Sequence, residues 1–128
     1  MQTRKVAIID HDEKLIREVK ETLVMGGYVP VVVTNAHLAV DTVVWSKPDV
    51  ILLELSMPGK NGFKLNEELS RVSQDKKIPL IAMSDFFTEE FTWLLELCGI
   101  KRFLKKPFQP LDLIWAIENE LEENSQLN

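Results

Sequence analysis

Three short and entirely apolar runs, each ending at a polar residue, constrain the fold of this chain more than any other feature of its sequence. They are Val6–Ile9, followed by Asp10; Val50–Leu53, followed by Glu54; and Leu80–Met83, followed by Ser84. A continuous apolar run of this length, rich in β-branched residues, is typical of a strand buried on both faces. We therefore expect all three runs to lie inside a parallel sheet.

Segments with helical periodicity alternate with these runs. In the first, Ile16, Val19 and Leu23 share one face, and Gly26–Gly27 supplies the stop. The predicted buried residues of the later helices are Leu38, Ala39, Val40 and Val43; Phe63, Leu65, Leu69 and Val72; and Leu113, Ile117 and Leu121. Asn35 and Thr88 are predicted helix caps, Gly99 ends the fourth helix, and the last helix is expected over about Pro110 to Glu122.

Two weaker strands complete the alternation. Tyr28–Val33 contains Pro30, which cannot donate to a ladder and so predicts an edge strand, and Lys101–Lys105 is centred on two apolar residues. Five alternations of strand and helix predict an open, doubly wound α/β fold, with a five-stranded parallel sheet and helices on both faces. A closed eight-unit barrel needs about twice this chain length.

Composition excludes several classes of function. With a formal net charge of -5, the 128 residues are not expected to bind nucleic acid directly. The single cysteine, Cys98, cannot form an intrachain disulfide, and we expect it to be a packed, inert thiol. Val6–Ile9 is too short for a signal-peptide core or a membrane span, so we expect a cytoplasmic protein without a membrane partner.

Chemically useful residues stand where the predicted strands end. Asp10, His11 and Asp12 follow the first strand, and Glu54, Ser84 and Lys106 follow the third, fourth and fifth. Because ligands bind outside the carboxyl ends of strands in open parallel sheets, these side chains are expected to share one edge. Acids that converge repel one another unless a lysine or a cation such as Mg²⁺ offsets them.

Four blocks of the chain, in order and with their spacing, carry a family resemblance. They are VAIIDHDE (6–13), PDVILLELSMPGKNG (48–62), IPLIAMS (78–84) and KPF (106–108). They resemble the receiver domains of bacterial two-component response regulators, the CheY-like family. The resemblance implies a flavodoxin-like sheet with strand order 2-1-3-4-5, a receiver domain over residues 1–122 and a polar tail over 123–128.

The resemblance also implies a role for individual residues. Asp10 and His11 fall on the acid pair that holds Mg²⁺, and the backbone carbonyl of Ser56 falls on a further ligand. Glu54 falls on the phosphorylated aspartate, and Ser84 and Lys106 fall on the groups that bind the phosphoryl group. Phe103 falls on the switch aromatic, and Pro107 on a proline whose peptide bond is commonly cis.

Two departures from the family pattern decide the expected function. Glu54 replaces the aspartate and carries one more methylene, and a displacement of about 1 Å can cost 10²-fold in rate. His11 replaces a metal-binding acid, and imidazole is a poor ligand for magnesium. Asp12 remains an alternative to the lost acid, because the run Asp10–His11–Asp12 still holds two carboxylates. We therefore expect weak or absent Mg²⁺ binding, with the Glu54 carboxylate reaching towards Ser84 and Lys106.

The resulting prediction is a non-enzymatic receiver that signals by phosphorylation-independent protein–protein interaction. The alternative is a working phosphoreceiver that takes a phosphoryl group from a histidine kinase with Mg²⁺. A flavodoxin-like cofactor carrier is a third reading, but Asp10–Glu13 would repel an anionic cofactor.

Aromatic residues near the end of the chain suggest where a partner binds. Helical geometry places Trp115 opposite the buried face of the last helix, and Phe87 and Phe103 belong to neighbouring segments. We expect these three to form a partner face for a signalling protein, an output domain or a second copy of the chain. Trp45 is expected to pack with a partly wet edge, and the histidines His11 and His37 to face solvent.

Overall fold

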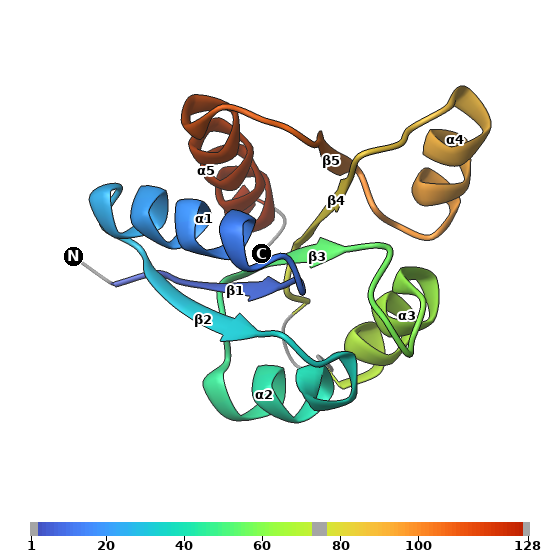
Figure 1. The fold of residues 1–128 in the computed structure, drawn as a ribbon, viewed down its shortest axis with the longest axis horizontal. Helices are drawn as coiled ribbons and strands as arrows, with labels where there is room; N and C mark the ends of the chain where they lie inside the picture. The colour runs from blue at the N-terminus through green and yellow to red at the C-terminus, as the bar shows by residue number, and fades with distance from the viewer. Residues whose placement is uncertain (1–2, 73–76, 127–128) are drawn as a thin grey trace.

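The computed structural model describes residues 3–72 and 77–126 and contains a parallel five-stranded sheet (Figure 1). The strands are β1 (Lys5–Ile9), β2 (Val29–Val33), β3 (Val50–Glu54), β4 (Leu80–Ser84) and β5 (Arg102–Lys105). Their order in the sheet is β2-β1-β3-β4-β5. The predicted fold class and strand order are confirmed.

Helices cover both faces of this sheet. They are α1 (Glu13–Met25), α2 (Ala39–Ser46), α3 (Gly62–Val72), α4 (Glu89–Leu97) and α5 (Pro110–Gln126), with a short 3₁₀ turn, η1 (Ala36–Leu38), before α2. One apolar cluster joins α1 and α5 to the sheet, and a second joins α2, α3 and α4 to its other face. Figure 1 shows α1 and α5 together on one side and α2 and α3 on the other. None of the helices within the described ranges is long and apolar enough to cross a membrane.

The central strands form the core, as their apolar runs predict. Every residue of β3 is buried, and so are the last four residues of β1. At the edge, Pro30 of β2 lies opposite Val6 in the ladder, which confirms the predicted edge strand. Burial on both faces fixes the register of β1 and β3, and therefore fixes where Asp10 and Glu54 lie.

The β3–α3 connection depends on a glycine for a steric reason. Gly62 donates its backbone N–H to the Leu55 carbonyl at 3.0 Å. A Cβ atom on Gly62 would lie 2.6 Å from the Leu55 Cα atom, which is closer than real contacts allow. The second glycine of the Met-Pro-Gly-x-x-Gly loop therefore lets the start of α3 pack directly above the end of β3, beside Glu54.

The predicted caps Asn35 and Thr88 are present, and Asp12 is a further cap that was not predicted. The Asp12 side chain accepts hydrogen bonds from the backbone N–H groups of Lys14 and Leu15 and so caps α1. Asn35 caps η1, and Thr88 caps α4 through the backbone N–H of Phe91. Because the Asp12 carboxylate bonds the first turn of α1, the side chain points towards that helix.

Four predictions of burial are wrong. Leu38, Val72, Trp45 and Cys98 are all exposed. Leu38 belongs to the 3₁₀ turn and so does not follow the period of α2, while Val72 and Cys98 stand at helix ends, beyond the last packed turn. The short α2 fills its buried face with Ala39, Val43 and Ser46, which leaves Trp45 85% exposed.

The last helix is longer than predicted. It continues beyond Glu122 to Gln126. Glu123 lies in the added turn and accepts a hydrogen bond from Arg102 of β5 at 2.8 Å. This contact with the sheet stabilises a turn that its polar composition does not indicate.

Candidate functional site

The carboxyl ends of four strands bring together the residues that the sequence predicts. Asp10 follows β1, Glu54 and Ser84 end β3 and β4, and Lys106 follows β5. The Lys106 backbone N–H donates to the Ser84 carbonyl at 2.7 Å, which extends the β4–β5 pairing by one residue. The peptide bond from Lys106 to Pro107 is cis. This local geometry places the Lys106 side chain over the ends of the central strands.

Lys106 joins the two acids directly. Its ammonium group donates to Asp10 Oδ2 at 2.7 Å and to Glu54 Oε1 at 2.6 Å. The Asp10 side chain is fully buried, and those of Glu54 and Lys106 are nearly so. Charge-assisted hydrogen bonds of this length are among the stronger polar interactions in proteins. Asp10, Glu54 and Lys106, hereafter the acid–lysine triad, form the centre of the candidate site.

Backbone groups satisfy the remaining carboxylate oxygens of the triad. Asp10 Oδ1 accepts from the N–H groups of His11 at 2.7 Å and Asp12 at 3.0 Å. Glu54 Oε2 accepts from the N–H of Ser56 at 3.0 Å. These backbone donors stabilise two carboxylates that share a single lysine. Buried carboxylates need such hydrogen-bond and charge partners, because burial without them costs much free energy.

The protonation of Lys106 follows from these contacts. Burial by itself lowers the pKa of Lys106, but the hydrogen bonds and negative charges of Asp10 and Glu54 outweigh burial. The net result is a Lys106 pKa above its ordinary value, so the ammonium form persists at neutral pH.

Ser84 and His11 lie at the same edge but make other contacts. The Ser84 hydroxyl accepts from the Phe86 backbone N–H at 3.1 Å and donates to the Phe86 carbonyl at 3.2 Å. The His11 ring is exposed, and its Nδ1 atom lies 3.8 Å from Asp10 Oδ1. The expected reach of Glu54 towards Lys106 is therefore present, whereas the Ser84 hydroxyl bonds the backbone of Phe86 in the loop that follows β4.

The predicted Mg²⁺ ligands do not fit a metal ion in this arrangement. Mg²⁺ requires oxygen ligands in near-octahedral geometry, usually with several waters. The Lys106 ammonium group instead bonds the Asp10 carboxylate, and the other predicted ligand side chain, that of His11, is an exposed imidazole. Within residues 3–72 and 77–126, no group of three or more His, Cys, Asp or Glu residues is placed to hold a metal.

The predicted partner face is divided into two environments. Phe103 and Phe87 are half-buried, with ring centroids 4.8 Å apart. Phe87 in turn contacts Phe91 of α4 at 5.7 Å, and Phe91 contacts Phe63 of α3 at 5.6 Å. This row, the phenylalanine stack, links β5 to α4 and α3 through the interior. Phe87 and Phe103 therefore offer little free surface.

Trp115 is exposed on α5, as predicted, at 60% of its surface. The Arg102 guanidinium lies 5.1 Å from the centre of its ring, a cation–π arrangement. Arg102 is held there by Glu120 at 3.1 Å and Glu123 at 2.8 Å. Sequence reasoning missed this group, although the acids Glu120 and Glu123 are three residues apart on one helical face and so indicate a site for a cation.

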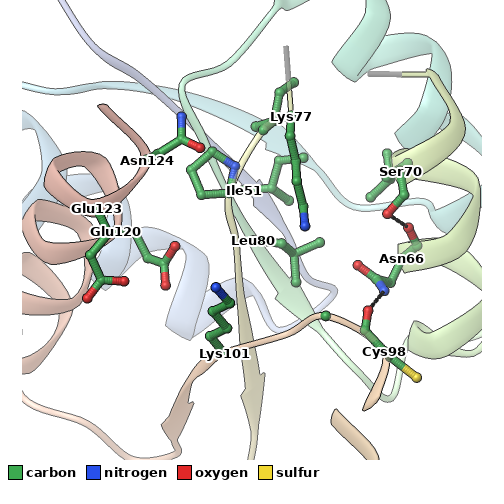
Figure 2. Close-up of a pocket in the computed structure, with 14 residues that line it drawn as sticks. Ile51, Asn66, Ser70, Lys77, Leu80, Cys98, Lys101, Glu120, Glu123 and Asn124 are labelled. Carbon is green, nitrogen blue, oxygen red and sulfur yellow. Dashed lines mark hydrogen bonds between the residues drawn. The ribbon is translucent and has the colours of Figure 1, made fainter. Parts of the chain in front are cut away.

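A cavity of about 100 Å³ lies at the opposite end of the sheet from the triad (Figure 2). Ile51, Leu80 and Lys101, from the amino-terminal ends of β3, β4 and β5, contribute to its wall. Asn66 of α3 donates to the Cys98 carbonyl at 3.2 Å beside it. The cavity lies at the amino-terminal ends of the strands and the triad at their carboxyl ends, so the cavity is separate from the candidate site.

Comparison with known proteins agrees with this fold. Residues 6–118 match the model of the response regulator receiver domain family. The chain belongs to this family of two-component signalling domains, whose members typically bind Mg²⁺ at the phosphorylation site and are themselves not enzymes.

Two curated relatives are about twice as long as this chain. The phosphate regulon transcriptional regulatory protein PhoB of Pseudomonas aeruginosa is 32% identical over 111 residues, which is 86% of this chain and 48% of that protein. PhoB of Escherichia coli K12 is 30% identical over 116 residues, or 90% of this chain and 50% of that protein. This chain therefore spans about half the length of the curated relatives that it matches.

Solved structures show the same fold at lower identity. The chemotaxis protein CheY4 of Vibrio cholerae superposes with a TM-score of 0.86 at 24% identity, covering 93% of this chain and 99% of that one. A CheY-like receiver domain protein from Methanospirillum hungatei gives a TM-score of 0.89 at 19% identity, covering 99% and 100%.

Proposed function

We propose that this receiver domain acts by phosphorylation-independent interaction with other proteins. The observation that carries the proposal is the pair of bonds from the Lys106 ammonium group to Glu54 and Asp10, at 2.6 and 2.7 Å. In the family pattern, Lys106 corresponds to the residue that pairs with the phosphoryl group. Here a side chain of the protein itself satisfies that lysine, so the domain is held in one arrangement without a signal.

The same contacts oppose phosphoryl transfer to Glu54. Transfer needs a carboxylate oxygen that is free to approach the donor in line, with a cation close by. One Glu54 oxygen accepts from Lys106 and the other accepts from the Ser56 backbone. Freeing either oxygen breaks a charge-assisted bond in a buried site, which raises the barrier to reaction.

Other proteins are the partners that this reading requires. The candidates are a signalling protein or output domain in the cytoplasm, a histidine kinase, or a second copy that meets the surface of α4, β5 and α5 around Trp115. The net charge of -5 favours a protein partner over nucleic acid. Arg102 and the acids that hold it provide a directional polar contact beside the exposed Trp115 ring.

The test is incubation with acetyl phosphate and Mg²⁺, followed by intact-mass spectrometry under mild conditions. We expect the mass of the protein to stay unchanged. The control is the double variant Glu54→Asp, His11→Asp, which restores both acids of the family pattern and is expected to gain one phosphoryl group.

A different result would support the alternative of a working phosphoreceiver. If the unaltered protein gains a phosphoryl group, and Glu54→Gln abolishes that gain, then Glu54 accepts phosphate and the proposal is wrong. If both the unaltered protein and Glu54→Gln gain the group, another residue is the acceptor, and the proposal is equally wrong.

A further inference from the structure

The cavity of about 100 Å³ at the amino-terminal ends of β3, β4 and β5 is bordered by parts of the chain that lie far apart in sequence (Figure 2). Helix α3 contributes Leu69, the turn between α4 and β5 contributes Gly99, and the last turns of α5 contribute Glu120. In another protein, a cavity of about 150 Å³ binds benzene. This cavity has about two-thirds of that volume and so suits a body of about four carbon atoms.

The inner wall of this cavity is largely apolar. Ile51 and Leu69 are buried and Leu80 is partly buried. Asn66 also lines the cavity and is 8% exposed. Its Nδ2 atom donates to the Cys98 carbonyl at 3.2 Å, which fixes the amide and leaves its Oδ1 atom facing the cavity (Figure 2). A small molecule in this space therefore meets apolar side chains and one hydrogen-bond acceptor.

Charged side chains of both signs line the cavity, but only the acids are paired. Glu120 and Glu123 accept hydrogen bonds from Arg102 at 3.1 and 2.8 Å. Lys77 and Lys101 have no ion pair within the part of the chain that the structure describes, and both side chains point towards the cavity (Figure 2). With Arg102 included, three cationic groups face two carboxylates, so the local charge favours an anion.

We propose that this cavity binds a small organic carboxylate with a short apolar body. The carboxylate accepts hydrogen bonds from the ammonium groups of Lys77 and Lys101, and the apolar body lies against Ile51, Leu69 and Leu80. Charge-assisted hydrogen bonds favour an anion over a neutral molecule of the same shape. The apolar wall favours an organic anion over an inorganic one, because only the organic anion removes apolar surface from water. This inference goes beyond the interaction role proposed above and does not depend on it.

The probe is sodium butyrate, titrated into the isotopically labelled full chain at an ionic strength held constant with sodium chloride. Amide chemical shifts are followed by NMR. We expect saturable shifts at Asn66, Gly99 and Lys101, with a Kd of about 1 mM, and none at Ser56 beside the triad. Butyramide has the same shape without the charge, and acetate lacks most of the apolar body. Each is expected to bind at least about tenfold more weakly than butyrate, a difference of roughly 1.4 kcal/mol.

Matched lysine variants locate the ligand on the domain. The double variant Lys77→Gln, Lys101→Gln is expected to weaken butyrate binding at least about tenfold, because it removes both charge-assisted hydrogen bonds. Both lysines are exposed, so this variant is expected to fold. Lys20→Gln removes an exposed lysine from α1, on the other face of the sheet, and is expected to leave the affinity within about twofold.

Several outcomes would overturn this inference. Absence of saturable shifts up to about 20 mM butyrate, roughly twenty times the expected Kd, would mean that the cavity holds no such ligand. Equal binding of butyramide would exclude a role for the two lysines, and equal binding of inorganic phosphate would exclude a role for the apolar wall. Unchanged affinity in the double variant Lys77→Gln, Lys101→Gln would place butyrate elsewhere on the domain. The proposed function fails separately, because phosphorylation of Glu54 with butyrate binding intact contradicts only that proposal.

Discussion

Lys106 is the residue on which the chemistry of this domain depends. One ammonium group serves two buried carboxylates, so the triad carries one more negative than positive charge. The backbone N–H groups of His11, Asp12 and Ser56 offset the excess. The extra methylene of Glu54 matters because it lets the carboxylate meet the ammonium group at 2.6 Å.

Removal of the lysine is expected to destabilise the fold strongly. Lys106→Met leaves Asp10 and Glu54 buried without a cation, and breaking such a pair typically costs about 3–5 kcal/mol. The measurement is the free energy of unfolding in urea. Lys105→Met removes the same charge from an exposed neighbour and is expected to change stability by less than about 0.5 kcal/mol. Equal effects of the two variants would mean that the triad contributes nothing specific.

Stability is also expected to fall at alkaline pH. The folded-state pKa of Lys106 is raised above its ordinary value of 10.5 by Asp10 and Glu54. Its contribution is therefore complete below pH 10.5 and is lost as the pH rises through the folded-state pKa. Lys106→Met should lack this part of the pH dependence of the unfolding free energy.

Tyr28 must be separated from this effect. Burial, together with the charge of Glu118, raises the pKa of Tyr28 above its ordinary value of 10.0, so its ionisation destabilises the fold in the same direction. The comparison is therefore made in a Tyr28→Phe background. If the unfolding free energy falls identically at alkaline pH with and without Lys106 in that background, the prediction is wrong.

For individual residues, the sequence predicts which ones form the site, but it does not predict the hydrogen bonds that they make. Strand ends predict that Asp10, Glu54, Ser84 and Lys106 share an edge, and they do. The sequence does not show whether the Ser84 hydroxyl faces Glu54 or the following loop, and in the structure it bonds the Phe86 backbone. Cys98 was placed wrongly for a related reason, because helical periodicity fails at a helix end.

Among the elements, α4 is held mainly by ring contacts. Phe91 and Phe87 connect it to Phe63 and Phe103. Since these rings also border β5, the position of α4 is tied to the strand that carries Lys106 at its end.

The neighbours Phe86 and Phe87 allow a matched test of this attachment. Phe87→Ala is expected to cost about 2–3 kcal/mol, less than the 3–5 of a fully buried phenylalanine, because the ring is half-buried. Phe86→Ala removes an exposed ring and should cost less than about 0.5 kcal/mol. Chemical denaturation of both variants provides the measurement, and similar costs would exclude a structural role for the phenylalanine stack.

Most of the strands and helices can be predicted from the sequence. Continuous apolar runs predict β1, β3 and β4, and Pro30 predicts the edge position of β2. On α4, the stripe of Glu90, Trp93, Leu94 and Leu97 stands at positions i, i+3, i+4 and i+7, but periodicity alone favours an inward face. Only the position of Leu95 in the folded chain shows that the stripe faces outward.

At the scale of the molecule, within residues 3–72 and 77–126, packing is strongest at the centre of the sheet, and among the α-helices it is weakest at α4. All of β3 is buried, whereas α4 buries one residue completely. Local opening requires less free energy where fewer apolar contacts must break.

Native-state hydrogen exchange is expected to follow this gradient. Amides of β1 and β3 should exchange only through global unfolding, and amides of α4 should exchange through local opening at a lower free energy. Uniform protection across the sheet and α4 would contradict the gradient.

The order of synthesis determines when the triad can form in a newly made chain. Glu54 precedes Lys106 by 52 residues and Asp10 precedes it by 96. At about 5–20 residues per second, the ribosome adds the lysine roughly 3–10 s after Glu54. Until then, Asp10 and Glu54 have been made without the ammonium group that they share in the folded domain. The triad can therefore form only after β5, the last strand, has been made.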